Sequence, residues 1–108
     1  MIDDANLISL IEKDIMSFDS VSRFPDLGLT DSIQRAIGRD IPENGIRITE
    51  DDDCITINCE IIVFFGVNIP QLCYDIQTKV KSDVERVTGI MVKAVNIKVD
   101  GIDEKPEN

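Results

Sequence analysis

The segment from Cys54 to Ile102, CITINCEIIVFFGVNIPQLCYDIQTKVKSDVERVTGIMVKAVNIKVDGI, carries the clearest periodicities in the chain. Its first part, Ile55–Phe65, alternates between apolar and polar side chains, as a strand does when one of its faces lies in a core. Gly66 ends this alternation. Pro70 then suits the first turn of a helix, where its missing N–H costs no hydrogen bond. The segment therefore begins as a strand that leads into a helix.

The second part of the segment has helical spacing and then alternates again. Apolar residues recur along one side of the helix: Leu72, Cys73, Ile76, Val80, Val84 and Val87. Gly89 is suited to the left-handed conformation that ends a helix. Val95–Val99 alternates and predicts a second strand. A strand–helix–strand unit crosses over right-handed, so we expect this last strand to be parallel to the first.

The N-terminal half predicts smaller elements. Residues 4–18 have helical spacing, residues 19–28 predict a loop, and residues 30–37 predict a short helix. Ile46–Thr49 predicts a short strand that forms a hairpin with the main strand. The last strand could pair with either of these two strands. The polar tail, residues 103–108, is expected to fray.

Together these elements predict an α+β fold. We expect a two-layer sandwich in which the helices pack on one face of a small, three-stranded mixed sheet. Residues 1–108 form a single domain, since the chain is of ordinary domain length, and its core spans about residues 5–102.

Charge and composition exclude several classes of function. The net charge is −10 and the sequence has no histidine. Nucleic-acid binding and direct adsorption to anionic lipid both depend on Lys and Arg, so neither is expected. No run of about 18 apolar residues is present, so no direct membrane insertion is predicted. The N-terminus lacks the basic region of a signal peptide, which predicts a cytoplasmic protein.

Candidate catalytic and metal-binding groups are few. Without histidine, the commonest general acid/base and metal ligand is missing. Cys54, Cys59 and Cys73 are odd in number and lack Cys-x-x-Cys spacing, so they predict buried thiols, with a metal or redox site as the alternative. Glu50–Asp53 predicts a solvated hairpin turn, with a cation site as the alternative. We predict no catalytic, cofactor or metal site.

One pair of residues departs from the alternation of the main strand. Ile62 and Phe64 fall on its otherwise polar face. If no other element covers them, they form an exposed apolar patch, and such patches tend to be contact sites. We hypothesise that Ile62 and Phe64 belong to an interaction surface. The alternative is that the short helix or a loop covers them.

Several short motifs, in this order and spacing, resemble the alkaline shock protein family of Gram-positive bacteria, also called the envelope stress response family. They are Phe65–Pro70, the helix spacing from Ile76 to Glu85, Val87–Gly89 and Val95–Gly101. Ala36–Arg39 and Gly45–Ile48 extend the resemblance to about residues 5–102. Ser20 departs from it, since that position normally carries glycine.

The resemblance implies a non-enzymatic protein of cell-envelope homeostasis or envelope stress. It implies action through self-assembly into a homo-oligomer or through docking on a membrane-anchored partner. Two alternatives stay open. One is a regulatory adaptor that binds a cytoplasmic enzyme, such as an enzyme of lipid synthesis. The other is a small enzyme that uses Cys73 or a pair of carboxylates.

Overall fold

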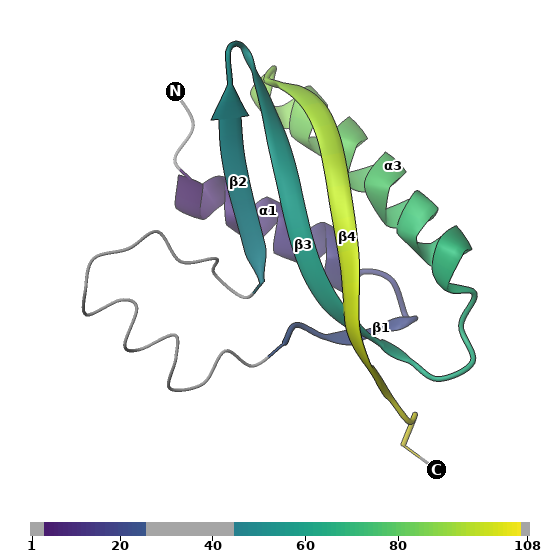
Figure 1. Cartoon of the computed structure of the whole chain (residues 1–108). Coiled ribbons are helices and arrows are strands. Elements are labelled where there is room, and N and C mark those ends of the chain that lie inside the picture. Colours follow the sequence, from purple (N-terminus) through teal and green to yellow (C-terminus); the bar gives the residue numbers. More distant parts are fainter. Residues whose placement is uncertain (1–3, 26–44, 107–108) are drawn as a thin grey trace.

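The computed structural model describes residues 4–25 and 45–106 of the 108-residue chain. These ranges hold two helices and four strands: α1 (Asp4–Met16), β1 (Val21–Arg23), β2 (Ile46–Asp51), β3 (Cys54–Phe64), α3 (Ile69–Thr88) and β4 (Met91–Asp103). Both helices lie on one side of the sheet (Figure 1). The predicted α+β class, with helices on one face of the sheet, is therefore confirmed. The short helix predicted for residues 30–37 lies outside the described residues.

β3 is the central strand of a mixed sheet. It pairs with β4 in parallel over its whole length, and with β2 and β1 in antiparallel fashion. Because β4 occupies one side of β3 throughout, β2 and β1 lie end to end along the other side. The prediction that the last strand is parallel to the main strand is confirmed, and its neighbour is the main strand itself.

The predicted strand number was wrong, because the sheet has four strands. The additional strand, β1, lies in the segment predicted to be a loop. Its three residues are too few to show a period, so the sequence contains no strand signal there. It forms because β2 ends its pairing at Cys59, and Val21 and Arg23 then pair with Val63 and Ile62 of β3. Backbone groups of a buried strand need such partners.

The core lies between the sheet and the two helices. On β3 the side chains of Ile57, Ile61 and Val63 are fully buried. They face the buried stripe of α3, which consists of Leu72, Ile76, Val80 and Val84, and the buried residues Leu7, Ile11 and Ile15 of α1. Val87 was predicted to extend the stripe of α3. That prediction was wrong, since Val87 is 52% exposed in the last turn of the helix.

Both ends of α3 are capped, at Asn68 and at Gly89. The side chain of Asn68 accepts a hydrogen bond of 3.1 Å from the N–H of Gln71, and Pro70 lies in the first turn. Gly89 has φ 74°, and its N–H donates to the carbonyl of Glu85 at 2.9 Å. The predicted left-handed cap at Gly89 is confirmed.

β4 is longer than the predicted strand Val95–Val99, because it follows β3 along its full length. Asp103 belongs to it, so the predicted polar tail begins one residue later. The carboxylate of Asp103 accepts hydrogen bonds from the hydroxyl of Ser22 at 2.6 Å and from Nε of Arg23 at 3.0 Å. The end of β4 is thereby joined to β1.

Candidate interaction surface

The sheet has one face that no helix covers in the described part of the chain (Figure 1). We call it the open face. Strand register places polar side chains side by side on it: Asn58 of β3 lies opposite Arg47 of β2 and Asn96 of β4, and Glu60 lies opposite Lys98. The strands alternate, so the same geometry that places Ile57 and Ile61 in the core places this polar set outside.

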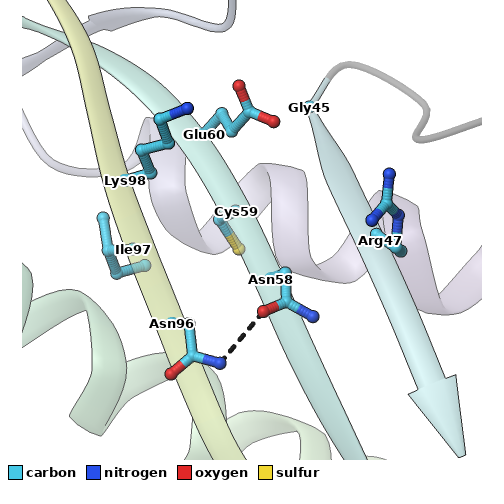
Figure 2. Close-up of a pocket in the computed structure, with 8 residues that line it drawn as sticks. All are labelled: Gly45, Arg47, Asn58, Cys59, Glu60, Asn96, Ile97 and Lys98. Carbon is cyan, nitrogen blue, oxygen red and sulfur yellow. Dashed lines mark hydrogen bonds between the residues drawn. The ribbon is translucent and has the colours of Figure 1, made fainter.

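A shallow hollow of about 190 Å³ lies on the open face. It is lined by Gly45, Arg47, Asn58, Cys59, Glu60, Asn96, Ile97 and Lys98 (Figure 2). Nδ2 of Asn96 donates a 2.9 Å hydrogen bond to Oδ1 of Asn58, which joins the two strands across its floor. The hollow thus presents amides and charges of both signs, groups that can hydrogen-bond a polar partner.

Glu60 and Asp100 form a pair of carboxyl groups beside this hollow. A hydrogen bond with Asp100, together with partial burial and the Asp100 charge, raises the pKa of Glu60. Lys98 and Arg47 act in the opposite direction. Nζ of Lys98 also lies 3.7 Å from Oδ1 of Asp100. The pair is therefore balanced by two neighbouring cations on the same face.

The two residues of the predicted interaction surface, Ile62 and Phe64, differ in their exposure to solvent. Ile62 is only 8% exposed, so the condition of the hypothesis, that no other element covers it, is not met for Ile62. It is flanked by Arg23 of β1 and by Gly101 of β4, and both strands shield it. Phe64 is half-buried, with Nζ of Lys105 5.7 Å from its ring centroid. The contact-surface hypothesis stays a prediction, now centred on Phe64.

Two exposed apolar residues at the same end of the sheet were missed. Phe65 is 73% exposed and Ile102 is 57% exposed. The N–H of Phe65 donates to the carbonyl of Asp103 at 2.8 Å, so Phe65 lies beside the end of β4. The alternation assigned Phe65 to the core face. Gly66, which ends the strand directly after it, was the signal that this position lies at the margin of the core.

A buried carboxyl group was also missed. Asp14 of α1 is 5% exposed, and within the described residues its Oδ2 accepts no hydrogen bond from an N–H or hydroxyl group. Burial, and then the neighbouring carboxyl of Asp83, raise the pKa of Asp14 to about 6. The signal was its spacing, since Asp14 follows Ile11 by three residues and so lies toward the apolar side of the helix.

The cysteines differ in exposure. Cys59 is buried, as predicted, and burial raises its pKa to about 12. Cys73 is half-buried, and burial raises its pKa as well. Cys54 is also half-buried, and its thiol donates to the carbonyl of Asp51 at 3.2 Å. Thiols with a raised pKa are mostly protonated near neutral pH and are weak nucleophiles.

The acidic segment Glu50–Asp53 comprises the end of β2 and the two-residue turn to β3, and all four side chains are exposed. The predicted solvated hairpin is therefore confirmed. Across residues 4–25 and 45–106, no group of three or more Cys, Asp or Glu side chains is placed to hold a metal ion. In the same ranges, no helix has the length and apolar character needed to cross a membrane.

Comparison with known proteins gives a family and several relatives. Residues 2–104 match the alkaline shock protein 23 family, which has a cell envelope-related function. The chain is 30% identical over 74 residues to the uncharacterized protein YloU of Bacillus subtilis (strain 168), covering 68% of this chain and 62% of that protein. It is 37% identical over 54 residues to the uncharacterized protein Spy1535 of Streptococcus pyogenes serotype M6, covering 50% of this chain and 42% of that protein.

The chain thus spans less than two thirds of the length of these relatives. No solved structure matches it. The family match covers nearly all of the chain, including every helix and strand described above. By this match, the chain belongs to the alkaline shock protein family, whose function is related to the cell envelope.

Proposed function

We propose that this chain is a non-enzymatic protein of cell-envelope homeostasis that works by contacts with other proteins. In this proposal its open face docks on a membrane-anchored partner from the cytoplasmic side, and copies of the chain also associate with one another. The observation that carries the proposal is the open face, a broad sheet surface without a covering helix in the described residues. The family's envelope-related function gives its cellular setting.

The chemistry of the open face supports protein docking. Lys98 lies opposite Glu60, and the amides of Asn58 and Asn96 lie in one row with Arg47 across the three strands (Figure 2). Such a mixture of charges and amides suits a specific polar contact with another protein. Phe64 is the last residue of β3, and Phe65, directly after it, is 73% exposed. Aromatic side chains are enriched among the residues that contribute most to binding at protein interfaces.

The state of the candidate catalytic groups supports a non-enzymatic role. The thiols of Cys59 and Cys73 have raised pKa values, which disfavours the reactive thiolate. The carboxyl of Asp14 is buried between two helices. Glu60 and Asp100 are the carboxyl pair that an enzymatic alternative would use, since they lie beside the hollow.

Site-specific photocrosslinking tests the proposal. A photoreactive amino acid replaces Asn58 on the open face, and a matched variant carries it in place of Ser82, which is exposed on α3. We expect the first variant, expressed in the organism of origin, to crosslink to a membrane protein, and the second not to. Crosslinks to a soluble enzyme would instead support the adaptor alternative. Equal crosslinking from both positions would contradict docking through the open face.

A further inference from the structure

β4 is an edge strand. It runs over 13 residues, and within the described part of the chain β3 is its neighbour on one side and no strand lies on the other. An edge of this length exposes a row of backbone N–H and C=O groups, which can pair with another strand. Native proteins usually protect such edges, because unpaired backbone groups need partners.

Side chains of α3 protect the first half of the edge. Nζ of Lys81 donates to the carbonyl of Val92 at 2.9 Å, and the N–H of Val92 donates to Oε2 of Glu85 at 2.9 Å. Nε2 of Gln77 donates to the carbonyl of Val95 at 2.8 Å. Three successive turns of the helix thus occupy the edge from Val92 to Val95. No second strand can pair there without displacing these side chains.

The second half of the edge is open. Residues of a strand point their backbone groups to alternate sides, so Ile97 and Val99 present theirs on the same outer side as Val95. Within residues 4–25 and 45–106, no side chain or loop makes a hydrogen bond to these outer groups. Among the described residues, strand pairing is therefore blocked at one end of β4 and left available at the other.

The charges around Val99 are self-complementary. Lys98 and Asp100 flank it, and both side chains lie on the open face, where they contact each other and Asp100 also bonds Glu60. If two copies of this segment pair antiparallel about Val99, Lys98 of each lies opposite Asp100 of the other. Opposite charges in directly facing positions favour strand pairing, and like charges disfavour it.

We infer that a second copy of this chain pairs with the open half of β4 in antiparallel fashion, centred on Val99. This inference deepens the proposed function, because it gives self-association a location. The two Val99 residues exchange N–H to C=O hydrogen bonds across a two-fold axis. The axis is perpendicular to the sheet, so both open faces lie on the same side of the joined sheet. A dimer thus presents both of its open faces on one side, where both can dock on membrane-anchored partners.

The test uses charge reversal on the full chain. Lys98→Asp places two acidic residues opposite one another, and Asp100→Lys places two basic residues there. We expect the wild-type chain to move toward twice its mass of 12.1 kDa in a concentration series measured by light scattering. Each variant alone should raise the dimer dissociation constant by roughly tenfold or more, since two attractive cross-strand pairs become repulsive.

Mixing the two variants gives the sharpest result. In a mixed dimer, each of the two facing pairs again joins one acidic and one basic side chain, so the mixture should regain the wild-type mass although neither variant does so alone. A charge effect within one chain cannot produce this recovery. Lys93→Asp is the matched control. It makes the same charge reversal at an exposed side chain of β4, in the half whose backbone edge is bound by α3. The mass curve of this variant should follow the wild type.

Three outcomes would overturn the inference: a wild-type chain that stays monomeric, single variants that dimerise like the wild type, or a mixture that does not recover. If a charge variant does not fold by circular dichroism, Val99→Pro replaces it, since proline removes the outward N–H at the centre of the pairing. The crosslinking experiment reports separately on the membrane partner. Docking can therefore fail while edge pairing holds, and the reverse.

Discussion

The carboxyl group of Asp14 on α1 shares a hydrogen bond with the carboxyl group of Asp83 on α3. Such a bond requires a proton, which the carboxyl of Asp14 carries and donates to the carboxylate of Asp83. Asp14 is 5% exposed, and its pKa is raised to about 6, first by burial and then by Asp83. The pKa of Asp83 is lowered, because it accepts from Asp14 and from Arg86. Lys79 and Arg86 are the cations that face the pair.

This pair predicts that stability falls as pH rises through about 6. The folded chain binds the Asp14 proton more tightly than the unfolded chain, whose pKa is near 3.8. The stabilisation is fully present below that value and is lost as pH rises through the folded pKa. The loss is at most about 3 kcal/mol, because each pKa unit corresponds to about 1.4 kcal/mol. Urea denaturation at a series of pH values measures it.

Asp14→Asn is the matched variant for this experiment, because the amide keeps a donor toward Asp83 and does not titrate. Its unfolding free energy should change less than that of the wild type between pH 4 and 7. The comparison also removes the contribution of Glu60, whose pKa is raised in both proteins. Parallel pH curves for the two proteins would contradict the prediction.

Two valines of α3 provide a matched test of the core. Val80 is fully buried against the sheet, whereas Val87 is 52% exposed. Val80→Ala should lower the free energy of unfolding by about 2 kcal/mol, because it removes two buried methyl groups and leaves a cavity. Val87→Ala should change it by no more than about 0.5 kcal/mol. Equal effects in thermal or urea unfolding would show that the last turn of α3 belongs to the core.

Two glycines separate backbone strain from packing. Gly89 has φ 74°, and an added Cβ would meet no atom within 4 Å, so Gly89→Ala should cost about 1 kcal/mol through its left-handed backbone alone. Gly101 lacks this conformation, and an added Cβ there would meet Ile62 at an ordinary 3.8 Å. Gly101→Ala should be neutral or slightly stabilising. The reverse order of the two effects would argue against the C-cap.

Thiol reactivity tests the non-enzymatic role. Cys59 is buried with its pKa raised to about 12, so it should react with iodoacetamide only after unfolding. Cys73 should react more slowly than a free thiol at pH 7, because its pKa is also raised. Mass spectrometry of peptides after timed alkylation measures both rates. Rapid alkylation of Cys73 in the folded chain would favour the enzymatic alternative.

Local periodicity in the sequence was sufficient to predict β3, α3 and the buried side of each. The alternation of β3 and the helical spacing of Leu72, Ile76, Val80 and Val84 each extend over several periods, so the buried side follows from the sequence. The caps were equally local, since Asn68 and Gly89 act on backbone groups a few residues away. The parallel course of β4 followed from a general rule of crossover connections.

Contacts between distant segments could not be predicted in this way. β1 forms because β3 extends past the end of β2, and nothing within Val21–Arg23 indicates that geometry. Ile62 is buried for the same reason, since strands on both sides shield it. Lys81 and Glu85 lie four residues apart on α3 and form the ion pair that this spacing indicates. Both also bind the backbone of β4, which the spacing does not indicate.

The distinction has one physical cause. A side chain's period along the chain reports which side of its own helix or strand is apolar, because that depends only on 3.6-residue or two-residue geometry. Which groups a helix or strand contacts along its sides depends on how the strands align in the sheet and where each one ends. The tertiary structure alone therefore determined the partner of Asp14, the shielding of Ile62 and the open half of β4. None of these has a local pattern in the sequence.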